Sequence, residues 1–493
     1  MFRLSSYAIL SERLEGGGYA LLSGITGAIE LINDELYELL VSLSNASNDA
    51  YAVGANTATN YAKARATATS ILTQQEPVWL QSDAVPPELL STYLERGHFT
   101  ELDYDQERLL LTKVAENLHQ SERSFASAVI VPELDCNYRC VYCFERAMQS
   151  SLRSERSYMT EQEVDAVFHC IDELIATTGK NIESIALFGG EPLMLENLSI
   201  IEHIVKLGRL RGIRFSAISN GHDLDGFTDL LGSNGIASVQ VTIDGPKHLH
   251  DARRIALDGS SSFDRIIRNT EHVLKQTDVN INIRINLDDE NHPHLPELLA
   301  YFAERGWLTN NRILVNVSMV YQKDSCGAST PTYDVSALRQ ELNPTLHQYP
   351  SVTVGSAQTA QTTQVLTSLV HDQPIQLRSS YCAANSGMYV FLPNGKISCC
   401  WELIGEECSQ IGSYTTQGLN LDVDKTEYWF NRSVAVIPQC LDCRYCLVCG
   451  GGCAQNAEFT TGDINTPNCD SLPETFAWVL ADAVEGFLQV HNL

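Results

Sequence analysis

Three cysteines with the spacing Cys136-x3-Cys140-x2-Cys143 follow a strand-like run at residues 126–131. Cysteine thiolates hold iron–sulfur clusters, and a cluster of four irons normally takes four of them. A cluster held by this triplet would be one thiolate short, so one iron would be open to another ligand. The same spacing also fits three buried structural cysteines or part of a zinc site.

The length, charge and cysteine content of the chain limit the kinds of protein that it could be. The chain has 493 residues, which predicts two or three domains, and a formal net charge of −28, which repels nucleic acid and anionic lipid. No apolar run approaches the ~20 residues of a membrane span, and nothing near the N-terminus has the pattern of a signal peptide. We therefore expect a cytoplasmic protein with neither nucleic acid nor membrane as a partner. Its fifteen cysteines indicate metal or redox chemistry rather than disulfides.

Between residues 125 and 321, short β-branched apolar runs alternate with segments of helical period, which predicts a parallel β/α unit. The polar segments that begin at Cys136, Gly189, Ser219 and Asp244 each follow one of the first four strands. Because the carboxyl ends of such strands form one rim, we expect these segments to converge on one site. The expected strands are 126–131, 185–188, 213–218, 238–243, 281–285 and 313–320, and the expected helices are 160–177, 196–210, 223–231, 263–276 and 294–305.

These residues resemble the radical S-adenosylmethionine (radical SAM) superfamily over roughly residues 131–470. The cysteine triplet is similar to its CxxxCxxC motif, Gly189-Gly-Glu-Pro192 to its GGEP segment, and Thr242-Ile-Asp-Gly245 with His250-Asp-Ala-Arg-Arg254 to its S/T-x-D-G and H-D-x-x-R stretches. The resemblance implies an α/β fold with a partial (β/α)6 barrel. It also implies a [4Fe–4S] cluster on Cys136, Cys140 and Cys143 that binds SAM and cleaves it to a 5′-deoxyadenosyl radical.

The resemblance also implies a set of SAM-binding residues. Glu191 would face the amino group of SAM, and the guanidinium fork of Arg254 would hold its carboxylate. His250 is expected to make a structural hydrogen bond, and the catalytic base is unassigned. The remaining residues are Tyr142 near the adenine, Gly189 and Gly190 beside the amino group, Ser219 and Asn220 in the pocket wall, and Thr242 facing the ribose.

A second group of ten cysteines lies between Cys382 and Cys469. Its spacing resembles the SPASM pattern, which implies two auxiliary [4Fe–4S] clusters. One would be held by Cys440, Cys443, Cys449 and Cys469. The other would be held by Cys382, Cys400 and Cys453, with Cys399, Cys408 or no cysteine as its fourth ligand. Cys446 is a further thiol among these ligands, zinc is the alternative metal, Cys326 is unassigned, and Cys170 is expected in a helix core.

The cysteine distribution and the resemblance divide the chain into five predicted segments. They are an α+β extension over 1–120, the partial barrel over 121–325, a bridge over 326–379, the SPASM domain over 380–472 and a helix over 473–493. The extension is either a precursor-binding module or a structural lid. Smaller expected elements are strands at 7–10 and 19–22, helices at 28–42, 87–97, 105–120 and 335–342, and a polar helix or loose connection at 45–73.

SPASM proteins mostly act on peptides or proteins, so the resemblance predicts a maturase of a ribosomally made precursor peptide. Its product would be a thioether or carbon–carbon crosslink, and its partners the peptide and an electron donor such as flavodoxin or ferredoxin. One alternative is formylglycine formation on a protein. That branch has an acidic base after the cysteine closing the first SPASM motif, where this chain has Trp401 and then Glu402. Another alternative is a non-catalytic iron–sulfur or zinc protein.

Overall fold

The computed structural model forms two compact units, each assembled from separate stretches of sequence. Unit 1 comprises residues 1–122, 360–382 and 432–493, and unit 2 comprises residues 123–359 and 383–431. The five predicted segments stay a prediction, and Cys326, residues 46–73 and most of the predicted helix at 335–342 lie outside the described residues. Those described are 1–45, 79, 87–143, 156–323, 329–331, 341–342, 344–346, 348–349, 351–354, 356–469 and 472–491.

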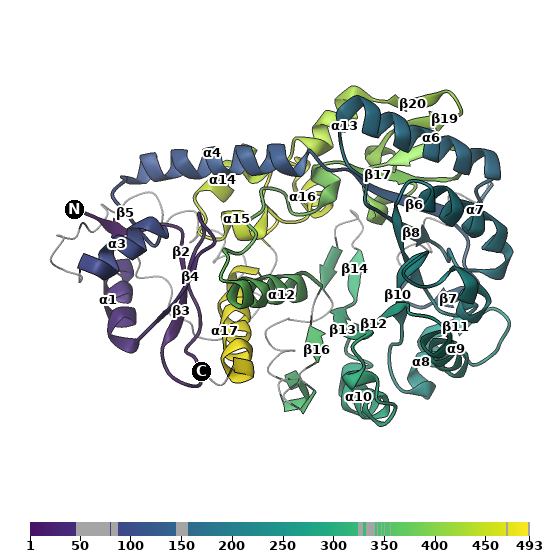
Figure 1. Cartoon of the computed structure of the whole chain (residues 1–493), viewed down its shortest axis with the longest axis horizontal. Helices are drawn as coiled ribbons and strands as arrows, with labels where there is room; N and C mark the ends of the chain where they lie inside the picture. Colours follow the sequence, from purple (N-terminus) through teal and green to yellow (C-terminus); the bar gives the residue numbers. More distant parts are fainter. Residues whose placement is uncertain are drawn as a thin grey trace. The chain divides into compact units, whose positions relative to one another are not determined.

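Unit 2 is built on an eleven-stranded sheet whose centre is the predicted parallel β/α unit (Figure 1). Neighbouring central strands are parallel and follow one another in chain order. This arrangement confirms the predicted α/β class. The central strands are β6 (Ser127–Glu133), β8 (Ser184–Gly189), β9 (Arg214–Ser219), β10 (Ile236–Thr242), β12 (Asn280–Leu287) and β13 (Ile313–Met319).

Helical crossovers connect these strands at the predicted places. A capping box between Thr160 and Glu163 starts the first of them, and Gly179 ends it with φ 68°. The third crossover, expected as an α-helix, is the 3₁₀ helix η2 (Leu224–Leu230). Gly226 lies in its middle, and glycine weakens an α-helix. The other crossovers are α6 (Glu161–Thr178), α7 (Leu198–Arg209), α9 (Ser262–Gln276) and α10 (Leu295–Glu304).

The sheet continues on both sides of the predicted strands. On one side, β17 (Met388–Phe391) pairs parallel with β6, and β18 (Lys396–Ser398), β19 (Gln410–Thr415) and β20 (Gly418–Leu421) follow antiparallel. On the other side, β16 (Val352–Val354) pairs parallel with β13. Part of the cysteine-rich region is therefore an extension of the same sheet.

Unit 1 contains a small antiparallel sheet formed by β2 (Ala8–Leu10), β3 (Tyr19–Ser23) and β4 (Ile29–Ile32). The predicted helix at 28–42 is wrong over its first residues, because Ile29–Ile32 pairs with β3. Asn33 then accepts a hydrogen bond from the Leu36 N–H, which caps α1 (Asp34–Asn45). The unit also contains β1 (Arg3–Leu4) paired with β5 (Phe99–Thr100), and helices α3 (Pro87–Glu95) and α4 (Tyr104–Glu122).

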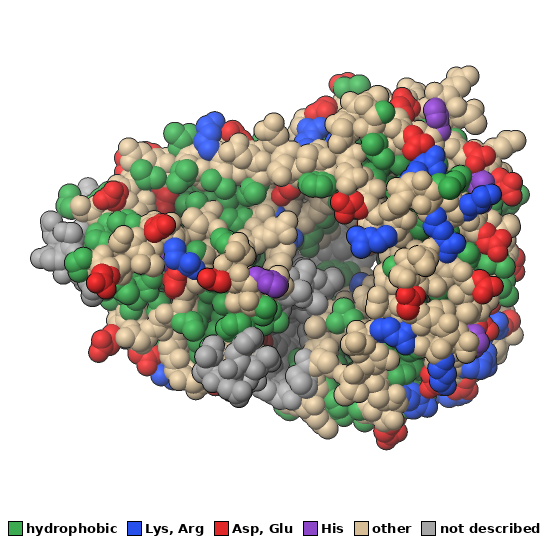
Figure 2. All heavy atoms as spheres, in the orientation of Figure 1, with side chains coloured by type: hydrophobic (Ala, Val, Ile, Leu, Met, Phe, Trp, Pro, Cys, Tyr) green, Lys and Arg blue, Asp and Glu red, His purple; other side chains and the backbone are tan. Residues whose placement is uncertain are grey.

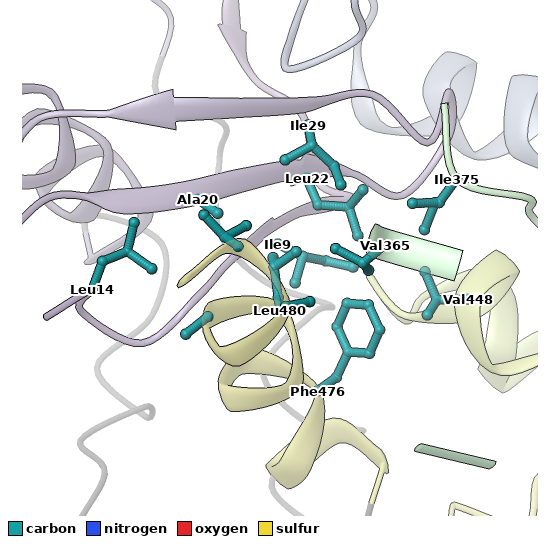
Figure 3. Close-up of a cluster of buried hydrophobic side chains, with 13 residues drawn as sticks. Ile9, Leu14, Ala20, Leu22, Ile29, Val365, Ile375, Val448, Phe476 and Leu480 are labelled. Atoms are coloured by element: carbon teal, nitrogen blue, oxygen red, sulfur yellow. The ribbon is translucent and has the colours of Figure 1, made fainter. Parts of the chain in front are cut away.

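The core of unit 1 joins its sheet to the C-terminal helix α17 (Leu472–His491). Phe476 and Leu480 from this helix are buried against Ile9 and Leu22 of the sheet (Figure 3). Val365 of α12 (Ser356–His371) belongs to the same cluster. The predicted C-terminal helix therefore contributes an apolar face to the core of unit 1.

The exposed charges of the two units are mixed in sign. On the face shown in Figure 2, Lys and Arg side chains are interspersed with Asp and Glu. Across the described ranges, none of the helices is both long and apolar enough to pass through a bilayer.

We expect Phe476→Ala to lower the free energy of unfolding by about 3–5 kcal/mol, because it leaves a cavity in this core. Leu31→Ala is the matched control, since Leu31 lies in the same unit and is 52% exposed. Urea denaturation followed by circular dichroism measures both changes. Equal destabilisation by the two variants would contradict the assignment of this core.

Candidate functional site

A short antiparallel ladder holds the cysteine triplet of unit 2. Strand β7 (Tyr138–Cys140) pairs with β11 (Arg254–Ala256), and Arg254 lies opposite Cys140. The Leu257 N–H extends this ladder by donating to the Asn137 carbonyl at 2.9 Å. The backbone therefore fixes the cysteine loop beside the segment that contains Arg254.

The three thiols of this loop lie close enough to influence one another. Burial raises the pKa of the Cys136 thiol, and negative charge on Cys140 and Cys143 would raise it further. Burial also raises the pKa of the Cys140 thiol, whereas the nearby Arg254 guanidinium lowers it. Such thiols ionise more readily when a cation is bound among them, which is how iron or zinc takes thiolate ligands. The donor set thus fits a three-thiolate iron–sulfur site.

Gly189 and Gly190 bring the end of β8 against the loop that leads to Cys136. A Cβ atom at Gly189 would lie 2.3 Å from the Glu133 carbonyl oxygen, and one at Gly190 would lie 2.2 Å from the Asp135 carbonyl oxygen. Only glycine permits this approach. A Cβ atom at Gly189 would also lie 2.7 Å from Val131 Cγ1, so the described neighbours of both glycines belong to the chain itself, whereas the resemblance implied contact with a ligand.

Glu191 is buried and connects the β8 and β9 ends of the site. One carboxylate oxygen accepts hydrogen bonds from the Leu193 N–H at 2.9 Å and the Ser219 hydroxyl at 2.8 Å, and the other accepts from the Asn220 N–H at 2.5 Å. Burial raises the pKa of Glu191 to about 7, although these hydrogen bonds and Arg254 act to lower it. A positively charged ligand group nearby would favour its ionised form.

Asn220 connects the β9 end directly to the cysteine loop. Its side-chain amide donates to Asn137 Oδ1 at 2.7 Å and lies 3.7 Å from the sulfur of Cys136. The side-chain oxygen Oδ1 of Asn220 accepts a hydrogen bond from the His222 N–H at 2.8 Å. The residue that sequence reasoning placed in a pocket wall therefore contacts a predicted cluster ligand.

Tyr142, predicted to lie near an adenine, belongs to a polar cluster with Arg254. The Arg254 Nη1 donates to the Tyr142 hydroxyl at 2.7 Å, and the hydroxyl donates to the buried Asp244. Asp244 also accepts from the Asn286 N–H at 2.8 Å and lies 3.9 Å from Arg254. Among the described residues the buried Arg254 Nε has no hydrogen-bond partner, which leaves a donor available beside Cys140.

His250 is hydrogen-bonded to Asp244 of this cluster, and Thr242 lies two residues before Asp244. The His250 Nδ1 accepts a hydrogen bond from the Asp244 N–H at 3.2 Å, as expected of a structural histidine. Burial lowers the pKa of His250 well below its usual range, so the ring is neutral. Thr242 is buried at the carboxyl end of β10.

Sequence reasoning missed a polar face of the sheet next to these residues. Thr242 lies beside Arg284 of β12, and Arg284 lies beside Asn316 of β13. The Arg284 Nε donates to Asn286 Oδ1 at 2.8 Å, and the buried Asn282 Oδ1 accepts no hydrogen bond from any described residue. The strict alternation of polar and apolar residues from Asn280 to Leu287 was the available signal.

The second cysteine group is divided between the units. Cys440, Cys443, Cys449 and Cys469 are all in unit 1, as are Cys382 and Cys453, whereas Cys400 and Cys408 are in unit 2. Burial raises the pKa of Cys449 to about 12, and charges on Cys443 and Cys469 would raise it further. Burial also raises the pKa of the Cys440 thiol, and negative charge on Cys449, Cys443 and Cys469 would raise it further. These four thiols are therefore neighbours, and their donor set fits a cluster with four thiolates.

Cys446 and Cys170 are both buried. Cys446 lies at the start of α15 (Cys446–Cys449) among the same thiols, and Cys170 lies inside α6 as expected. Elsewhere in unit 2, Trp401 follows Cys400 and packs against Phe188 with ring centroids 5.6 Å apart. Among the described residues, no group of three or more His, Cys, Asp or Glu is spaced to hold a single metal ion.

Gly450, Gly451 and Gly452 allow close backbone contacts around these thiols. All three have positive φ, from 74° to 85°. A Cβ atom at Gly452 would lie 1.8 Å from the carbonyl oxygen of Asn468, next to Cys469. A Cβ atom at Gly450 would lie 2.6 Å from the carbonyl oxygen of Ser380, two residues before Cys382. The glycines bring together the segments that carry the predicted ligands.

Comparison with known proteins supports the interpretation of these motifs. Residues 131–317 match the family model of the Radical SAM superfamily. The chain is 26% identical over 176 residues to the cysteine-type anaerobic sulfatase-maturating enzyme of Clostridium perfringens (strain 13 / Type A), covering 34% of this chain and 46% of that protein. It is 27% identical over 199 residues to the radical SAM cyclopropyl synthase TigE of Paramaledivibacter caminithermalis, covering 38% and 41%. The alignments span less than half of each relative.

A solved structure supports the fold over a longer stretch. The structure described as native anSMEcpe with bound AdoMet and Cp18Cys peptide has a TM-score of 0.53 and 18% sequence identity. The match covers 74% of this chain and 99% of that one. At this identity the match shows a shared fold and no more.

Gly190→Ala tests the contact between the β8 end and the cysteine loop. We expect it to reduce the iron bound by the anaerobically reconstituted protein, because the added methyl group displaces the loop that contains Cys136. The matched control is Gly16→Ala, since no atom lies within 4 Å of a Cβ at Gly16. Iron and sulfide analysis gives the readout, and equal iron in both variants would contradict the prediction.

Proposed function

Because this chain contains a radical SAM domain over residues 131–317, we propose that it is a peptide maturase that cleaves S-adenosylmethionine reductively. When bound, the cluster and SAM supply a 5′-deoxyadenosyl radical, which can remove hydrogen from an unactivated carbon. The observation that carries this proposal is the β7–β11 ladder, in which Arg254 lies opposite Cys140 of the cysteine triplet.

The residues of the site have separate roles in this proposal. Cys136, Cys140 and Cys143 hold the cluster. Arg254 binds the SAM carboxylate through the donors that face Cys140, and Glu191 accepts hydrogen bonds from the amino group. The remaining proposed contacts come from Tyr142, Gly189, Gly190, Ser219, Asn220 and Thr242.

We propose two auxiliary [4Fe–4S] clusters in the cysteine-rich region. Cys440, Cys443, Cys449 and Cys469 form one ligand set, and their mutual proximity in unit 1 supports it. Cys382, Cys400 and Cys453 form the other, with Cys399 or Cys408 as candidates for its fourth ligand. The clusters would accept the electron left after substrate oxidation, and a flavodoxin or ferredoxin would supply the electron for SAM cleavage.

The proposed substrate is a ribosomally synthesised precursor peptide, in which the enzyme closes a thioether or carbon–carbon crosslink. Formylglycine formation on a protein is the second candidate, because one relative is named a sulfatase-maturating enzyme. In this chain Trp401, and no acid, follows Cys400, which favours the crosslinking activity. A non-catalytic iron–sulfur or zinc protein is the third candidate, and the intact Glu191 and Arg254 environments support the first two over it.

Cys136→Ala tests SAM cleavage. The wild-type protein, reconstituted anaerobically and given dithionite and SAM, should form 5′-deoxyadenosine, which liquid chromatography measures. Cys136→Ala should abolish this product and keep the absorption of the auxiliary clusters, because it removes one ligand of the SAM-binding cluster alone. Cys170→Ala, a buried cysteine in a helix, is the control and should retain activity. Absence of 5′-deoxyadenosine from the wild-type reaction would refute the enzymatic proposal.

Mass spectrometry separates the proposed products. A crosslinked peptide should lose two hydrogens and show no reaction with a hydrazide, because no aldehyde forms. A product that reacts with the hydrazide would establish formylglycine formation instead. A product of unchanged mass would indicate epimerisation. The peptides tested are the products of any small open reading frames found beside the gene, and an unrelated peptide of equal length serves as the control.

A further inference from the structure

Arg432 is a fully buried arginine in unit 1 without a carboxylate partner. Its guanidinium donates hydrogen bonds to four backbone carbonyls, those of Ile464 at 2.5 Å, Gly452 and Gly451 at 2.9 Å, and Thr466 at 3.1 Å. Its side chain is 0% exposed, and among the described residues it forms no ion pair with Asp or Glu. The guanidinium is therefore held firmly in place by neutral groups.

Another buried arginine of unit 1, Arg3, has a carboxylate partner. Its Nη2 lies 2.8 Å from the Glu107 carboxylate, and both side chains are almost fully buried. A buried cation is costly without a compensating negative charge. Among the described residues, no carboxylate compensates the charge of Arg432 in this way.

The groups whose negative charge would act most strongly on the Arg432 guanidinium are cysteine thiolates. Burial lowers the pKa of Arg432, and negative charge on Cys440, Cys453, Cys382 and Cys449 would raise it. Arg432 in turn lowers the pKa of the Cys440 thiol, although burial dominates that thiol and raises its pKa overall. Two of the carbonyls that Arg432 contacts belong to Gly451 and Gly452, which lie between Cys449 and Cys453 in the sequence, so the buried cation lies beside predicted cluster ligands.

A cluster ligated by four thiolates is negatively charged, and its reduction adds a further electron. Net charge and local electrostatics set the reduction potential of such clusters. A fixed positive charge in a buried, low-dielectric environment stabilises the reduced state more than the oxidised state. The potential rises as a result.

We propose that Arg432 is the internal counter-cation of the auxiliary cluster held by Cys440, Cys443, Cys449 and Cys469, and that it raises the reduction potential of this cluster. The inference rests on the proposed function, which supplies the cluster. Arg432 does not touch the substrate in this proposal; its charge acts on the cluster. The four carbonyls hold its charge in place, and the thiolates provide the negative charge that the fold otherwise lacks there.

The test is a redox titration followed by electron paramagnetic resonance. Cys136→Ala is used as the background, so that the signals come from the auxiliary clusters. In this background, Arg432→Met should shift the midpoint of one auxiliary signal to a more negative potential, and Arg432→Lys should shift it less, because lysine keeps the charge. Arg3→Met is the control and should leave the midpoint unchanged, since Arg3 is paired with Glu107.

An unshifted midpoint in Arg432→Met with full iron content would overturn the proposal. If Arg432→Met binds too little iron to titrate, Arg432→Lys decides. Loss of iron in that variant as well would show that the hydrogen bonds matter and the charge does not. Absence of iron from the Cys136→Ala background would remove the auxiliary clusters and this inference together. Cleavage of SAM by the wild-type protein tests the proposed function separately.

Discussion

The antiparallel pairing of β7 with β11 is the interaction on which the candidate site depends. It joins the loop after β6 to a segment that follows β10, and so places the Cys140 thiol beside the Arg254 guanidinium. The other contacts build on this ladder. Gly190 packs against the backbone that enters the loop, and Asn220 contacts Cys136 from the next strand end. Disruption of the ladder would separate groups that arrive from four different strands.

Burial of like charges is the common electrostatic problem of both cysteine groups. In each group, burial raises the pKa of the thiols, and neighbouring thiolates would raise it further. Each group also has a buried arginine within electrostatic reach, Arg254 in unit 2 and Arg432 in unit 1. Among the described residues, the buried arginines are Arg3, Arg253, Arg254 and Arg432. Arg254 and Arg432, the two within electrostatic reach of the thiols, can therefore offset negative charge on the thiolates.

The sequence was sufficient to predict the six central strands, because each contains β-branched apolar residues and is separated from the next strand by a segment of helical period. The strand order then placed the polar segments at one rim. The β7–β11 ladder was not predictable, since strands of three residues leave no periodic signal. β4 was taken for helix because Ile29-Glu-Leu-Ile32 fits either period. The alternation of polar and apolar residues around Arg284 is present in the sequence. Which residues of the neighbouring strands lie beside these polar residues depends on the register of the sheet, which the sequence does not give.

The pairing of β17 with β6 also bears on the chemistry of the site. Because residues 383–431 continue the sheet, Trp401 packs against Phe188, the residue that precedes Gly189. An indole N–H donates hydrogen bonds and has no acceptor site, so Trp401 cannot remove a proton from a substrate. Glu402 is the next residue in the 3₁₀ turn η7 (Trp401–Leu403), where successive side chains point about 120° apart. The position that follows Cys400 therefore supplies no base, and the carboxylate of Glu402 is directed away from that position.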